Sequence, residues 1–162
     1  MDQENFLERL ISLLEAQGIR YCVIDRQAVN AYVEPLVSLD LDLVVAMEQL
    51  QEVEALLAEN FRVKQFPHSL NVSLAGSDLR VQIQTDPRYA PFPERASSGN
   101  VLGITLPVAS VEDVLAGKVW AAQDSTRRAS KRQKDLADIA RLIEAYPGLR
   151  DRVPSDVLSR LV

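Results

Sequence analysis

The sequence predicts an α/β protein, with helices flanking a mixed sheet and a helical C-terminal third. Strands alternate with helices over the first sixty residues, three short strands then follow one another, and apolar residues recur at helical spacing beyond Ser110. With 162 residues the chain is long enough for one packed domain and short for two. We therefore expect a single domain over residues 1–162.

The N-terminal half predicts helices that alternate with short strands. Apolar residues recur at helical spacing from Phe6 to Leu14, and Gly18 follows as a natural C-terminal stop. The other expected elements of this half are, in chain order, a strand over 21–24, a short helix over 27–32 that Pro35 ends, a strand over 39–45 and an amphipathic helix over 50–57.

The second half predicts a meander, a loop and then helices. Strands are expected over 61–66, 69–74 and 79–85, because turn residues separate these apolar segments. Residues 86–100 include three prolines and a Ser-Ser-Gly-Asn tail, so this segment is expected to be a loop long enough to be functional or mobile. Helices should follow from a capping-box-like start at Ser110 to Tyr146, with a break near 124–125 and a last short helix over 155–161.

Composition and charge exclude several classes of protein. No apolar run approaches the roughly 18–20 residues of a membrane span, and the N-terminus lacks the pattern of a secretory signal, so we expect a cytoplasmic protein. The net charge of -5 argues against nonspecific nucleic-acid binding by the whole surface, but it leaves room for a local basic patch. The only cysteine, Cys22, is expected in the core, and the only histidine, His68, is expected to be structural or exposed.

Two carboxylates in the strand over 39–45 are the main candidates for chemistry. Strict alternation puts Asp40 and Asp42, the acidic dyad, on one face and leucines on the other. Their Cα atoms should lie roughly 6.5–7 Å apart, so the carboxylates can converge on one cation. Close like charges favour a bound cation, and the hard cation Mg²⁺ suits oxygen ligands. The alternative is an edge strand with two hydrated acids.

A lysine and a basic run further along the chain could join the dyad. Lys118 falls at the centre of the apolar face of the helix over 110–122, so it must snorkel, pair with a buried acid or meet a ligand such as phosphate. Five of the eight residues in 127–134 are basic, which indicates a solvated helix face by default and a phosphate or RNA-backbone contact as the alternative. Asp135 flanks the apolar arc of the next helix and Asp138 lies nearly opposite it, which favours Asp135 as a site residue.

The order of these motifs resembles that of a known enzyme family. Residues 19–32, followed by Pro35, Ser38 and the acidic dyad, are similar to the minimal nucleotidyltransferases of the polymerase-beta superfamily, especially the AbiEii-like toxin branch. Residues 108–118 and 134–142 are similar to downstream segments of that branch. The similar segments together extend over about residues 5–146.

The resemblance implies a fold, a donor and a set of site residues. It implies a nucleotidyltransferase-like fold, a nucleoside triphosphate (NTP) as donor and Mg²⁺ held by Asp40 and Asp42. Lys118 would act with the dyad by neutralising charge on the transferred group. The toxin branch also implies an antitoxin partner. The expected nucleotide-binding residues are Arg26, Ser38, Lys118 and Asp135.

The chain departs from the pattern of the family at three places. The family usually has Gly-Gly or Gly-Ser after the first strand, where backbone N–H groups approach the triphosphate. Asp25-Arg26 stands there instead, so Asp25 should repel phosphate although Arg26 could supply a replacement contact. Leu36 stands where the family often has Arg. A third carboxylate, the general base in many members, is replaced by Gln82 and Gln84, which cannot accept a proton.

Three functions follow, of which we prefer the first. The intact dyad favours a Mg²⁺-dependent enzyme that transfers a nucleotidyl group from an NTP to a hydroxyl on protein, RNA or a small molecule. The unusual Asp25-Arg26 turn and the missing third acid favour a non-catalytic relative that acts through nucleotide or partner binding. An RNA-binding module that uses residues 127–134 has the weakest support, because no aromatic stacking platform accompanies the basic run.

Overall fold

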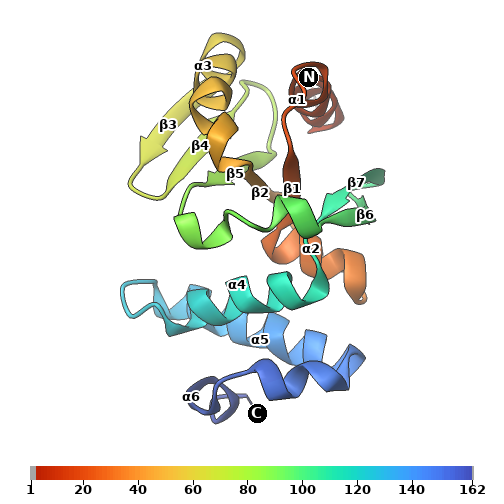
Figure 1. Ribbon diagram of the computed structural model, residues 1–162, viewed down its shortest axis with the longest axis vertical. Helices are drawn as coiled ribbons and strands as arrows, with labels where there is room; N and C mark the ends of the chain where they lie inside the picture. The colour runs from red at the N-terminus through yellow and green to blue at the C-terminus, as the bar shows by residue number, and fades with distance from the viewer. Residues whose placement is uncertain (1–2, 162) are drawn as a thin grey trace.

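The computed structural model describes residues 3–161, which form a seven-stranded mixed sheet with helices around it (Figure 1). The strand order is β3-β4-β5-β2-β1-β7-β6. The elements are α1 (Gln3–Ala16), β1 (Tyr21–Ile24), α2 (Asp25–Tyr32), β2 (Asp40–Val45), α3 (Leu50–Asn60), β3 (Arg62–Phe66), β4 (Ser69–Ser73), β5 (Arg80–Gln84), β6 (Ser97–Val101), β7 (Ile104–Val108), α4 (Val111–Gln123), α5 (Ala129–Ala145) and α6 (Ser155–Leu158).

The acidic strand β2 lies in the middle of the sheet. It pairs antiparallel with β1 and parallel with β5, and β3, β4 and β5 form the predicted antiparallel meander. The register places Asp42 beside Ile24 of β1 on one side and beside Gln82 of β5 on the other. Because β2 has a partner on both sides, the alternative that the acidic dyad lies on an edge strand is wrong.

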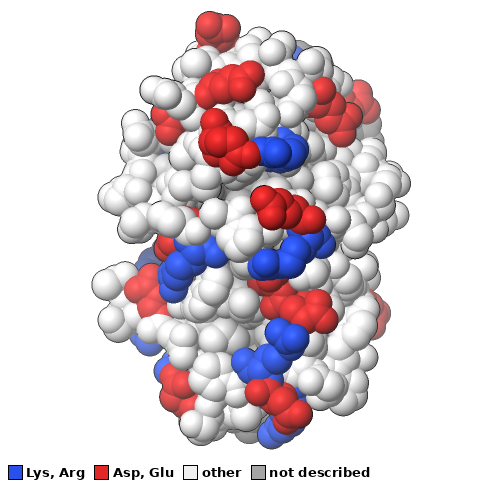
Figure 2. Space-filling view, viewed as in Figure 1, with Lys and Arg blue, Asp and Glu red and all other residues white. Residues whose placement is uncertain are grey.

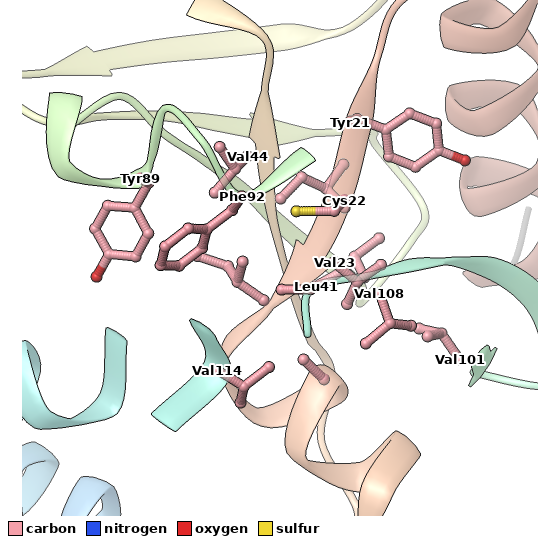
Figure 3. Close-up of a cluster of buried hydrophobic side chains, with 14 of the residues drawn as sticks. Tyr21, Cys22, Val23, Leu41, Val44, Tyr89, Phe92, Val101, Val108 and Val114 are labelled. Atoms are coloured by element: carbon pink, nitrogen blue, oxygen red, sulfur yellow. The ribbon is translucent and has the colours of Figure 1, made fainter. Parts of the chain in front are cut away.

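The hydrophobic core covers the face of β2 that carries its leucines. Leu41 and Leu43 are fully buried, and Figure 3 shows Leu41 among apolar side chains that include Cys22 and Phe92. The predicted N-terminal helix, α1, buries Phe6 and other apolar residues of one face. Each fully buried leucine or phenylalanine contributes about 1.5–3 kcal/mol to folding, so this packing fixes which face of β2 is left for the acids.

The expectation of a loop over residues 86–100 is wrong in its last part. Residues 97–101 form the edge strand β6, which pairs antiparallel with β7. The polar, glycine-containing segment carries little strand propensity of its own, so the pairing depends on its neighbour. Gly99 permits the close approach, because a Cβ added there would lie 2.8 Å from Val108 Cγ2. Leu102 and Gly103, both with positive φ, make the tight turn between the two strands.

The C-terminal third is helical, as predicted. The Ser110 hydroxyl accepts a hydrogen bond from the backbone N–H of Asp113 (3.2 Å) and caps α4. Asp124 accepts hydrogen bonds from the backbone and hydroxyl of Thr126, and the break between α4 and α5 lies there. Helices α4 and α5 pack against each other on one side of the sheet (Figure 1). No helix in residues 3–161 is both long and apolar enough to cross a bilayer.

Candidate functional site

A cleft of about 990 Å³ opens between the sheet and helices α4 and α5. Its lining includes the C-terminal end of β1, the polar faces of β2 to β5 and the first turns of α5. The structure brings every site residue predicted from the sequence to this cleft: Arg26, Ser38, Asp40, Asp42, Lys118 and Asp135. The chemistry of the cleft therefore depends on which partners these side chains have.

Asp40 is the outer member of the dyad and is bound by an arginine of the neighbouring strand. Its Oδ1 accepts a hydrogen bond from Arg80 Nε at 2.6 Å, and both side chains are more than half exposed. The parallel register puts Arg80 directly beside Asp40. The sequence does not reveal this contact, because it does not show which strand lies beside β2. A cation bound at Asp40 would have to replace this guanidinium or share the carboxylate with it.

Asp42 is the inner member of the dyad and lies close to a second carboxylate, Asp25. Burial and the negative charge of Asp25 raise the pKa of Asp42 well above its ordinary value. Burial also acts to raise the pKa of Asp25, but the charges of Lys118 and Arg127 outweigh it and hold that pKa below its ordinary value. Of these two neighbouring carboxyl groups, Asp42 is therefore the one that takes up a proton more readily, and a bound cation would oppose that shift.

Asp25 occupies the first position of α2 in a backbone conformation that suits glycine. Its φ is +61°, in the left-handed region, and the preceding N-cap residue Ile24 makes no side-chain cap. The side chain forms an ion pair with Lys118. A carboxylate therefore lies at the helix N-terminus where the family pattern would admit phosphate, as the sequence suggested.

Lys118 is buried among carboxylates, so the second of its three predicted alternatives is confirmed. Only 4% of the residue is exposed. Besides Asp25, its Nζ contacts Asp135 at 3.2 Å and Asp138 at 2.9 Å. Burial alone would lower the pKa of Lys118, yet the charges of Asp25, Asp138 and Asp135 raise it above its ordinary value. Lys118 is a permanent cation at the cleft wall.

The helical wheel placed Asp138 opposite the apolar face of α5, but the structure buries it, whereas Asp135 lines the cleft. Asp138 is fully buried, and it binds Lys118, Arg26 (3.1 Å) and Arg141 (2.8 Å). A helical wheel identifies one apolar face, whereas α5 packs against both α4 and α2, and Asp138 faces that junction. Arg26 is consequently held by Asp138, with 23% of its side chain exposed, and does not extend freely into the cleft.

The basic run divides between the cleft and the solvent. Arg127 is partly buried and donates a hydrogen bond to Asp135 Oδ2 at 2.7 Å. Lys131 and Lys134 are exposed and line the cleft, while Arg128 is exposed outside its lining. Figure 2 shows the distribution of basic and acidic side chains over one face of the molecule. The run thus forms a solvated face in part, and a phosphate or RNA-backbone contact by its cleft-lining residues stays a prediction.

The segment between α2 and β2 is held by hydrogen bonds from two helices. The guanidinium of Arg141 donates to the carbonyl of Glu34 (2.6 Å) and to Asn30 Oδ1 (3.2 Å). The Asn30 amide in turn pairs with both the N–H and the carbonyl of Leu36. We call these contacts the Arg141 clamp. Leu36, where the family often has Arg, is itself exposed.

Ser38 lies in the cleft at the start of the acidic strand. Its hydroxyl accepts a hydrogen bond from the backbone N–H of Asp40 (3.2 Å), and its carbonyl accepts one from the side chain of Gln27 (3.1 Å). These bonds orient the backbone that leads into the dyad. The Ser38 hydroxyl can still donate its own proton to a ligand oxygen.

The oxygen ligands available to a metal are those of the dyad. Gln82 and Gln84 line the cleft where a third carboxylate would stand, and no group of three or more His, Cys, Asp or Glu residues in the described part of the chain is arranged to hold a metal. Mg²⁺ commonly uses one or two carboxylates and completes its shell with water and substrate phosphates. The dyad fits this pattern, and a cation there would offset the crowding of negative charge around Asp42.

The other two candidate residues take no part in the cleft. Cys22 is fully buried in the core, and burial raises the pKa of its thiol to about 12. His68 is exposed between β3 and β4. Both predictions are confirmed.

Several solved structures share this fold. The antibiotic-resistance factor ANT(2'')-Ia is 13% identical, with a TM-score of 0.61 over 93% of this chain and 92% of that one. The lincosamide antibiotic adenylyltransferase LnuA is 14% identical, with a TM-score of 0.57 over 86% and 98%. A proposed nucleotidyltransferase from Thermotoga maritima is 16% identical, with a TM-score of 0.56 over 85% and 96%. At such identities the likeness shows the nucleotidyltransferase fold alone.

A family model matches most of the sequence. The model describes the nucleotidyl transferase AbiEii toxin of type IV toxin–antitoxin systems, and it matches residues 33–160. No curated protein sequence matches the chain significantly. The matched region includes Asp40, Asp42, Lys118 and Asp135. The chain belongs to the AbiEii family of nucleotidyltransferase toxins.

Proposed function

We propose that the protein transfers a nucleotidyl group from an NTP to a hydroxyl on protein, RNA or a small molecule, with Mg²⁺ held by Asp40 and Asp42. The observation that carries the proposal is the position of the dyad, on a central strand at the wall of a large cleft that Lys118 also lines. The dyad would hold the cation and Lys118 would add a fixed positive charge in the same cleft, which suits the stabilisation of a triphosphate. Bound Mg²⁺ would supply charge neutralisation on the phosphates.

The residues of the chain would share the work of binding and orientation. Asp40 would exchange its contact with Arg80 for the cation. The raised pKa of Asp42 would fall beside the same cation, so that Asp42 binds it as a carboxylate. Lys118 would stabilise negative charge on the transferred group, and Asp135 would hold Lys118 and Arg127 in place beside it. Ser38 and Arg26 would contribute phosphate contacts once Arg26 is released in part from Asp138.

Asp25 limits how well this site can bind its donor. Its carboxylate already pairs with Lys118 and stands at the N-terminus of α2, so a triphosphate must displace it and approach against its charge. We expect weak NTP binding as a result. Because Gln82 cannot take a proton from the acceptor hydroxyl, turnover should be slow as well.

The alternative is a non-catalytic protein of the same fold that acts through nucleotide or partner binding. The ion pair between Asp25 and Lys118 and the absence of a carboxylate at Gln82 favour it. The family description, a toxin of a two-component system, supports an antitoxin protein as the partner in either case.

Transfer of label distinguishes the two proposals. The natural protein, an Asp40→Asn, Asp42→Asn variant and an Asp25→Gly, Arg26→Gly variant are each incubated with Mg²⁺, a cell extract and one NTP labelled at the α-phosphate. We expect slow labelling of an acceptor by the natural protein, faster labelling by the glycine variant and none by the asparagine variant. NTP binding without labelling in every variant would support the non-catalytic alternative. Absence of NTP binding in all three proteins would contradict the enzyme proposal and leave partner binding as the function of the fold.

A further inference from the structure

Tyr89 lies in the cleft wall opposite the sheet, where no motif pointed to a function. It ends the short 3₁₀ turn Pro87–Tyr89, within the segment expected to be a loop. Its ring packs edge-on against Phe92, with centroids 5.1 Å apart, and against Trp120, with centroids 5.2 Å apart. Only 8% of the residue is exposed. The ring is therefore fixed in orientation by the aromatic side chains around it.

The hydroxyl of Tyr89 is the one part of the side chain that is free to interact. Figure 3 shows it turned away from Phe92 and the apolar cluster. Within the described residues it makes no hydrogen bond, yet no fully buried side-chain polar atom there lacks a partner. The hydroxyl must therefore reach the cleft, which Tyr89 lines.

Helix α4 leaves room for the Tyr89 ring at Gly117, the residue before Lys118. A Cβ added at Gly117 would lie 3.2 Å from Tyr89 Cε2 and 3.6 Å from its hydroxyl oxygen, so only glycine leaves the ring ordinary room. Glycine inside a helix normally destabilises it relative to alanine. The close approach of Tyr89 is the structural reason for glycine at this position, and it brings the hydroxyl to the residue that precedes Lys118.

The surroundings keep the hydroxyl protonated. Burial and the charge of Asp25 raise the pKa of Tyr89 to about 12. At neutral pH the group is therefore a hydrogen-bond donor, held rigidly in a cleft that Lys118 also lines. Anionic oxygen atoms are the acceptors that such a donor binds most strongly.

We propose that Tyr89 is a phosphate-binding residue, whose hydroxyl donates a hydrogen bond to an oxygen of the triphosphate beside Lys118. This inference rests on the proposed function, because it assumes that a triphosphate occupies the cleft. The Tyr89 hydroxyl compensates for a feature of this chain: Asp25 obstructs the backbone N–H groups that bind phosphate in the family pattern. The preorganised hydroxyl of Tyr89 takes the place of one of these N–H groups.

The probe is inorganic tripolyphosphate with Mg²⁺, titrated calorimetrically into the natural protein and into Tyr89→Phe. We expect the variant to bind about tenfold more weakly, the typical effect of losing one hydrogen bond to a charged acceptor. Its melting temperature should not change, because the hydroxyl has no partner within the described protein. The matched control is Tyr146→Phe, which removes a hydroxyl bonded to the carbonyl of Tyr32 outside the cleft and should leave the affinity unchanged.

Gly117→Ala provides a second variant that keeps the tyrosine. The added Cβ should push the ring away and lower the tripolyphosphate affinity, although the hydroxyl is still present. Equal affinity of Tyr89→Phe and the natural protein would refute the inference while leaving the proposed function intact. Absence of tripolyphosphate binding both in the natural protein and in the Asp25→Gly, Arg26→Gly background would instead contradict the proposed function itself.

Discussion

Replacing Asp25 by glycine should open the phosphate-binding turn at little cost in stability. The φ of +61° is strained for an L-residue by roughly 1–2 kcal/mol, and glycine removes that strain. Against this, the unfolded chain gains about 0.4–1 kcal/mol of conformational freedom. The ion pair with Lys118 is also lost, but a third of the Asp25 side chain is exposed and two other acids remain, so we assign this loss about 0.2–1 kcal/mol. The net change in unfolding free energy then lies between about -1 and +1.4 kcal/mol.

The same change should raise triphosphate affinity by a larger factor. Each charge-assisted phosphate contact regained is worth about 1.5–3 kcal/mol, or about tenfold to a hundredfold in affinity. Calorimetric titration of NTP with Mg²⁺ compares the natural protein, Asp25→Gly and the Asp25→Gly, Arg26→Gly double variant. The two glycine variants also separate the roles of the two residues, because Arg26 is held by Asp138 and its loss leaves that carboxylate with fewer partners.

Asp25→Asn is the matched control for charge. It keeps the size of the side chain and tolerates the left-handed conformation, so it should recover only the part of the affinity that repulsion removes. Tighter NTP binding by the natural protein than by every Asp25 and Arg26 variant would refute the reasoning. It would mean that Arg26 is a working phosphate ligand and that the turn is specialised for binding.

Three further predictions concern the dyad, the buried lysine and the cysteine. Asp40→Asn with Asp42→Asn should abolish Mn²⁺ binding in a calorimetric titration without unfolding the protein; unchanged metal affinity would remove the dyad from the site. Lys118→Ala should weaken NTP binding. It should also lower the free energy of unfolding by about 1–3 kcal/mol, because the two buried aspartates of α5 lose their shared cation but keep their arginine partners. A melting temperature equal to that of the natural protein would contradict this second part. Cys22 should resist a thiol reagent at pH 8 until denaturant unfolds the chain, and fast modification of the folded protein would contradict the burial of its thiol.

The sequence predicted some site residues correctly and others not, because strand alternation and helical periodicity carry different information. Strand alternation was sufficient to put Asp40 and Asp42 on one face, because a period of two fixes the direction of side chains without knowledge of the neighbours. The helical wheel correctly identified Lys118 as buried. It failed for Asp138, because a wheel drawn for one partner helix cannot anticipate a second contact with α2. The burial of a charge thus depended on tertiary packing that the periodicity does not contain.

Other features required the order of strands in the sheet. The contact between Arg80 and Asp40 arises from the parallel pairing of β2 with β5, two strands that lie far apart in the sequence. Strand β6 is polar and exists because β7 offers it a partner. Tyr89 lies in a proline-rich segment with no periodicity, so only its packing against Gly117 and Trp120 reveals its place in the cleft.

The Arg141 clamp connects helix α5 to the backbone that precedes the acidic dyad. Arg141 lies near the C-terminal end of α5, and through Glu34 and Asn30 it fixes the backbone that enters β2. A fragment reduced to the sheet and its first three helices would therefore retain both acids while losing what holds the preceding backbone in place. The smallest unit that keeps this backbone in place therefore includes α5.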